Sequence, residues 1–146
     1  MNDLVNYFGT RDLYEGEDKY FKKNPNVAGM ATEDNKIIIN PYSQISPEEK
    51  QAVAQNEAIR LFLRQSDYTP EFDLTKKQQE FFKGSEYEKN PAEARNTIIA
   101  RILTGDPSVG TVSKQQQQAA SEVMQQLNKF LSNNRPELNI MESTIQ

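Results

Sequence analysis

The chain has 146 residues, of which 36% are hydrophobic and 26% are charged, and its formal net charge at pH 7 is -4. That length is typical of one domain. The chain contains no cysteine and no histidine, which excludes disulfides, thiolate nucleophiles, imidazole metal ligands and histidine bases.

Two classes of partner are disfavoured by the same numbers. Domains that bind nucleic acid carry a basic face, whereas the basic residues here occur in groups of three at most. No stretch approaches the roughly 20 apolar residues of a membrane span, and the first residues lack the pattern of a secretory signal. We therefore expect protein partners, with no membrane, no nucleic acid and no cofactor.

The first 40 residues predict short elements. Apolar residues recur at spacings of three and four across 2–23, which indicates one or two short helices, and Pro25 interrupts the pattern. Within 27–40, two apolar stretches flank a polar turn at 33–36. Three consecutive isoleucines favour a strand, so we predict a β-hairpin there.

The rest of the chain predicts helices with clear start and stop signals. Ser46 is a suitable N-cap and Pro47 a suitable first helical residue for a helix that runs to Gln65. Thr75 caps a short helix that Gly84 ends. A further helix starts at Asn90-Pro91 and ends at Gly105, and Ser113 opens the last one, which runs to about Ser132.

Each long helix has one apolar side. In the first it contains Ala52, Asn56, Ile59 and Leu63, in the second Ala94, Ile98, Ile99, Ile102 and Leu103, and in the last Ala119, Ala120, Val123, Met124, Leu127, Phe130 and Leu131. The glutamines at 115–118 should form an exposed face. The elements predict a mainly helical α+β fold of four to six helices and one small β-hairpin. Residues 1–132 would form a single compact domain, and 133–146 a tail that is flexible or ordered on a partner.

One stretch has the spacing of a metallopeptidase site. Zinc peptidases of the zincin type carry two histidines at i and i+4 of a helix, with a glutamate base after the first. Here those positions hold Asn56, Glu57 and Arg60. Residues 35–64 thus resemble a zincin strand-plus-helix scaffold that lacks its zinc ligands, since a guanidinium stays protonated and cannot bind zinc.

A structural interpretation of these three residues is favoured over a catalytic one. Asn56 falls on the apolar side of its helix and would be a buried amide bonded to nearby backbone. Glu57 and Arg60 would be an i,i+3 ion pair near the surface. Neither the acidic groups at 15–18 and 33–34 nor the glycine loops have glycosidase, calcium or phosphate-loop spacing, so we expect no catalytic residue and no metal site.

Two other sets of residues are candidates for partner contacts. Phe81 and Phe82 are adjacent on a short helix and cannot both face one narrow core, so one should pack inside and the other could anchor an interface. The tail offers four apolar side chains: Leu138, Ile140, Met141 and Ile145.

The amino-acid sequences of three segments resemble those of small, mostly uncharacterised proteins of tailed bacteriophages. The segments are NPNVAGMATEDNKIIINPYS, NEAIRLFLR and NTIIARILTGDPS, within residues 24–108. The resemblance implies a viral setting, in the virion or the host cytoplasm. The predicted function is that of a non-enzymatic structural or accessory protein of a phage particle, in contact with other particle proteins or a second copy of itself.

Two alternatives remain at the level of sequence. A small acidic phage protein could bind and inhibit a host enzyme, which would need one dense acidic face. A hydrolase on the degenerate zincin-like scaffold is the other alternative.

Overall fold

The computed structural model describes residues 2–66 and 68–134. The elements in this part of the chain are α1 (Asn2–Phe8), α2 (Glu15–Lys23), β1 (Gly29–Ala31), β2 (Ile37–Ile39), α3 (Pro47–Gln65), α4 (Lys76–Phe82), the 3-10 helix η1 (Glu86–Lys89), α5 (Pro91–Leu103), the 3-10 helix η2 (Pro107–Val109) and α6 (Lys114–Asn133). The fold is mainly helical with one small antiparallel hairpin, so the predicted α+β class is confirmed.

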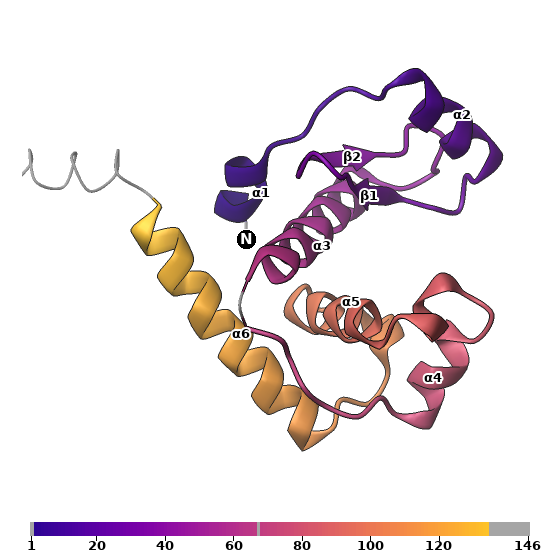
Figure 1. Cartoon of the computed structure of the whole chain (residues 1–146). Helices are drawn as coiled ribbons and strands as arrows, with labels where there is room; N and C mark the ends of the chain where they lie inside the picture. Colours follow the sequence, from indigo (N-terminus) through magenta and orange to yellow (C-terminus); the bar gives the residue numbers. More distant parts are fainter. Residues whose placement is uncertain (1, 67, 135–146) are drawn as a thin grey trace, which may run out of the picture.

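Helix α3 lies at the centre of the arrangement (Figure 1). It contacts α1 and both strands on one side and α5 on the other, and α5 in turn contacts α6. Helix α4 lies away from the hairpin, beyond α3 and α5, and η1 contacts both α4 and α5. The core therefore runs from the hairpin through α3 and α5 to α6.

The helix starts follow the capping signals in the sequence. A side-chain oxygen at each N-cap accepts a hydrogen bond from a backbone N–H in the first turn, which satisfies a donor without a partner inside the helix. These caps are Ser46, Thr75, Asn90 and Ser113. Because each cap stands where the sequence predicts it, the four later helices begin at the predicted residues.

The buried side of α3 is wider than predicted. Ile59 and Leu63 are buried as expected, but Ala52 is exposed and Asn56 is only half-buried. Buried positions occur around much of the helix: Ala54, Glu57, Ala58, Ile59, Leu61, Phe62 and Leu63. The cause is that α3 is covered on two sides, so a single apolar stripe does not describe it.

The glutamine run at the start of α6 is also not a uniformly exposed face. Gln116 is fully buried and forms a reciprocal amide pair with Gln78 of α4, with N–O distances of 3.1 and 2.7 Å. The same two amides donate to the carbonyls of Val109 and Asp73. The prediction of an exposed side chain was wrong for Gln116, because an amide whose hydrogen bonds are all formed within the protein can be buried in a core.

The hairpin packs closely on α3 at Gly29. The register pairs Gly29 with Ile39, Met30 with Ile38 and Ala31 with Ile37. A Cβ atom on Gly29 would lie 2.7 Å from Cγ1 of Val53 and 3.0 Å from the carbonyl of Ile38. Glycine at this position therefore permits the close approach of β1 to α3.

Gly29→Ala should lower the free energy of unfolding by about 1–3 kcal/mol, because the added methyl group must displace the backbone of β2 or the half-buried side chain of Val53. Chemical denaturation monitored by circular dichroism measures the change. Gly16→Ala is the matched control: no atom lies within 4 Å of its added Cβ, and the variant should keep or slightly raise stability. Equal stability of the two variants would contradict the close approach.

An arginine ties the hairpin turn to α2. The guanidinium of Arg11 donates to both carboxylate oxygens of Glu17, at 2.7 and 2.8 Å, and to both of Asp34, at 3.1 and 3.2 Å. It also stacks 3.8 Å from the ring centre of Tyr14. Hydrogen bonds from Arg11 lower the pKa of Glu17 and lower that of Asp34 to about 2.

Arg11→Gln should lower the melting temperature at pH 7 and have a diminishing effect as the pH falls. Both carboxyl pKa values are depressed in the folded state, so their stabilisation is present above the ordinary values of 4.5 and 3.8 and is lost toward pH 2. Thermal melts across this range measure it. Lys19→Gln, which removes an exposed pair with Glu15, is the control and should change little at any pH. A wild-type–variant difference that persists at pH 2 would contradict this assignment.

Candidate functional site

Arg60 connects two helices through two carboxylates. Its Nη1 donates to Oε2 of Glu57 on α3 at 3.2 Å, and its Nη2 donates to Oε2 of Glu93 on α5 at 3.2 Å. Glu57 is 7% exposed, and the Arg60 side chain 14%. The guanidinium carbon lies 5.4 Å from the ring centre of Tyr87. We call Glu57, Arg60 and Glu93 the Arg60 cluster.

The electrostatics of the cluster follow from its burial. Loss of water raises the pKa of Glu57, while the charges of Arg60 and Arg64 and the backbone of Ala31 oppose the rise. Since an arginine does not deprotonate in proteins, Arg60 supplies a fixed positive charge between two acids. The positive charge of Arg60 therefore compensates the negative charges of Glu57 and Glu93.

The cluster corrects the sequence-based interpretation of these residues. Asn56, expected as a buried amide, is half-buried, whereas Glu57, expected near the surface, is buried. The i,i+3 pair of Glu57 and Arg60 does form, at 3.2 Å. Its burial results from α5, whose Glu93 completes the network and whose position the sequence of α3 does not encode.

The cluster bears on the zincin-like spacing. Arg60 stands where the second histidine would be, and its guanidinium is directed at both Glu57 and Glu93. In residues 2–66 and 68–134, no three His, Cys, Asp or Glu side chains are grouped so that they could hold a metal ion. The Glu57 carboxylate, which would be the base, is paired with Arg60.

The two adjacent phenylalanines of α4 have different surroundings. Phe82 is 3% exposed and packs edge-on against Tyr87, with ring centres 5.5 Å apart. Phe81 is 54% exposed, and the guanidinium carbon of Arg101 lies 4.5 Å from its ring centre. Phe82 thus belongs to the core, and Phe81 remains as the side chain of the pair that a partner could contact.

Helix α4 has a hollow on each side. One of about 290 Å³ separates it from α5 and η2 and is lined by Lys77, Gln78, Glu80, Phe81, Ile98, Arg101, Ser108 and Val109. The other, of about 590 Å³, lies toward η1 and the start of α5, and its apolar lining consists of Leu74, Phe82, Tyr87, Pro91 and Ala94. Two hollows therefore flank α4, and exposed Phe81 lines the first of them. We call the first of them the α4–α5 hollow.

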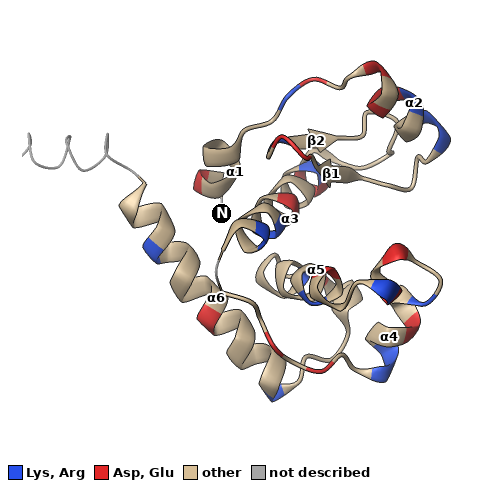
Figure 2. Cartoon of the chain, in the orientation of Figure 1, with Lys and Arg blue, Asp and Glu red and all other residues tan. Residues whose placement is uncertain are grey.

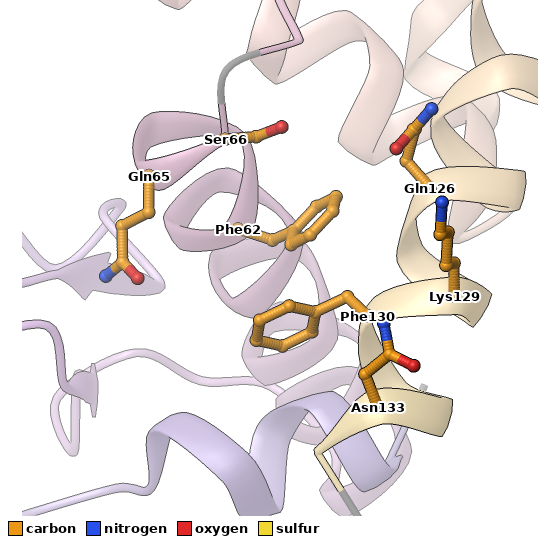
Figure 3. Close-up of a pocket in the computed structure, with 7 residues that line it drawn as sticks. All are labelled: Phe62, Gln65, Ser66, Gln126, Lys129, Phe130 and Asn133. Carbon is orange, nitrogen blue, oxygen red and sulfur yellow. The ribbon is translucent and has the colours of Figure 1, made fainter.

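A third hollow, of about 340 Å³, separates the ends of α3 and α6 (Figure 3). The rings of Phe62 and Phe130 line it and pack against each other at a tilt, with centres 5.3 Å apart. Its polar lining consists of Gln65, Ser66, Gln126, Lys129 and Asn133. Tyr7 of α1 packs edge-on against Phe130 at 4.9 Å, so this hollow lies beside an aromatic cluster.

The four candidate side chains of the tail, Leu138, Ile140, Met141 and Ile145, lie outside the described residues. Among the described helices, none is both long and apolar enough to cross a bilayer. No protein-family model, curated protein or solved structure matches the chain.

Two residues of these sites were missed by sequence reasoning. Glu93 is in the first turn of α5, where an acid is expected for capping and dipole reasons alone. Arg101 follows a run of isoleucine and alanine and has no charge partner at helical spacing on α5. That isolation of a basic residue among apolar neighbours was the available signal for Arg101, whereas nothing in the sequence connects Glu93 to Arg60.

Proposed function

We propose that the chain is a non-enzymatic structural or accessory protein of a tailed-phage particle, which acts through contacts with other particle proteins. The observation that supports the binding role is the exposure of Phe81 in the lining of the α4–α5 hollow. A large apolar side chain on an uneven, partly apolar face is a common interface anchor. The phage setting comes from the resemblance of residues 24–108.

The Arg60 cluster disfavours the hydrolase alternative. A general base must be free to take a proton from water within hydrogen-bond reach. The carboxylate of Glu57 is buried and accepts from Arg60, and removing it from that pair would leave Arg60 with Glu93 alone. The cluster is better suited to holding α3 against α5 than to activating water.

The inhibitor alternative needs a dense acidic face. In Figure 2, each of α2, α3 and α4 carries both acidic and basic residues. The largest acidic group, at 15–18 in α2, is followed by Lys19, Lys22 and Lys23, and Lys19 and Lys22 pair with acids in the group. Because acids and bases are mixed on the surface, this distribution favours individual ion pairs with a protein partner over mimicry of nucleic acid.

Mass spectrometry of density-purified particles tests the proposal. We expect the chain at a fixed ratio to the major particle proteins, in particles of the phage that encodes it. A chain cut after Asn133 should be incorporated less, because it lacks the apolar residues of the tail. Absence of the full chain from purified particles, or its presence only in the host lysate fraction, would refute a particle role.

A further inference from the structure

Arg101 is a half-buried cation without an acidic partner. Burial lowers the pKa of its guanidinium. The guanidinium forms a 3.5 Å hydrogen bond to Oγ of Ser108 and lies over the Phe81 ring. Among the described residues it forms no ion pair, whereas Arg11 and Arg60 each form two. Asp106, whose charge acts on it, instead accepts a hydrogen bond from the Ser108 amide.

The α4–α5 hollow has a surplus of positive charge. Its charged lining residues are Lys77 and Arg101 on the basic side and Glu80 on the acidic side. Lys77 and Glu80 are exposed, so water screens them, while Arg101 is partly withdrawn from water and its charge is felt more strongly. An acidic group placed here would offset the cost of burying Arg101.

The size of the hollow limits the occupant. Its volume of about 290 Å³ lies just below the lower end of the roughly 300–1,000 Å³ range of typical small-molecule sites. One wall is the exposed ring of Phe81 and another is Ile98. A carboxylate side chain with one apolar neighbour would use both features: the guanidinium for the acid and the ring for the apolar group.

We infer that the α4–α5 hollow receives an aspartate or glutamate side chain of the partner protein, flanked by an apolar residue that covers Phe81. The carboxylate pairs with Arg101 and approaches Lys77. Phe81 supplies apolar contact area, and the face of its ring holds the Arg101 guanidinium in place. This inference rests on the proposed function, because it specifies the chemistry of the partner at the surface that Phe81 anchors.

A peptide titration followed by NMR tests it. The full chain, labelled with nitrogen-15, is titrated with acetyl-Leu-Glu-Leu-amide and, separately, with acetyl-Leu-Gln-Leu-amide. The glutamate peptide should shift the amide signals of residues 77–81, 101 and 108–109. The glutamine peptide should bind at least roughly tenfold more weakly, because it cannot form the ion pair. A higher salt concentration should weaken the binding of the glutamate peptide more than that of the glutamine peptide.

Two variants locate the effect. Arg101→Met keeps the apolar stem and should bring the glutamate peptide down to the affinity of the glutamine peptide. Lys114→Met, which removes an exposed cation outside the α4–α5 hollow, is the matched control and should leave binding unchanged. Phe81→Ser, at an exposed position, should weaken the binding of both peptides, because both lose the apolar contact, and that of the glutamate peptide more, because the ring also positions the Arg101 guanidinium.

Three results would overturn the inference: equal affinity of the two peptides, signal shifts centred elsewhere, or no binding by either. Such a failure can be separated from failure of the proposed function. If a photoreactive residue at position 81 still cross-links to a particle protein, the binding role stands and only the acidic character of the contact is refuted. If that cross-link is absent as well, both fail.

Discussion

Arg60→Met should lower the free energy of unfolding by about 3–5 kcal/mol. The methionine fills similar space, but it leaves the carboxylates of Glu57 and Glu93 near each other without their cation. Glu57 is the more affected, because it is buried. Urea denaturation at neutral pH measures the change.

Two companion variants separate charge from packing. Arg64→Met removes an arginine from the same helix, at an exposed position where it donates at 3.4 Å to the carbonyl of Thr32, and should cost about 0.5 kcal/mol or less. Glu57→Gln combined with Arg60→Met should recover part of the loss, since no buried charge is then left at position 57. If Arg60→Met alone were as stable as wild type, the Arg60 cluster would not hold α3 against α5.

Asn40→Asp should cost about 3–5 kcal/mol although the side chains have nearly the same shape. Asn40 is fully buried, and its amide nitrogen donates to the carbonyls of Val27 at 2.7 Å and Asn24 at 3.2 Å. Its oxygen accepts from the backbone N–H of Tyr42 at 2.8 Å. A carboxylate would turn the donor into a buried negative charge that faces two carbonyl oxygens.

The matched control for this substitution is Asn26→Asp, in the loop between α2 and β1 whose carbonyls accept from Asn40. Asn26 is exposed, so its variant should stay within about 0.5 kcal/mol of wild type. Thermal and urea unfolding of both variants at pH 7 provide the comparison. Similar stability of the two would mean that the amide of Asn40 does not tie the end of α2 to the end of β2.

The local features of the fold were predictable from the sequence because short-range chemistry determines them. Ser46-Pro47 and Thr75 set helix starts through contacts within one turn, and the isoleucines at 37–39 with a polar turn before them define a hairpin. Gln116 was mispredicted because its burial depends on Gln78, 38 residues away. A polar side chain is classed as exposed unless its distant partner is known.

The same limit applies to the site. The i,i+3 pair of Glu57 and Arg60 was visible in the sequence, but its burial depends on Glu93, 33 residues from Arg60. That Phe81 and Phe82 have different surroundings was predictable from adjacency on a helix. Which of them is exposed was not, because the answer depends on where η1 packs against α4.

The most direct test of a binding role in the particle is a photo-cross-link at position 81. The full chain carrying p-benzoylphenylalanine in place of Phe81 is expressed during infection, particles are purified and irradiated, and the cross-linked peptides are sequenced. We predict one cross-linked particle protein, with the same substitution at exposed Tyr14, on the opposite side of the core, as the control that does not capture it. A cross-link to a single host enzyme, or none in particles that contain the chain, would contradict the account.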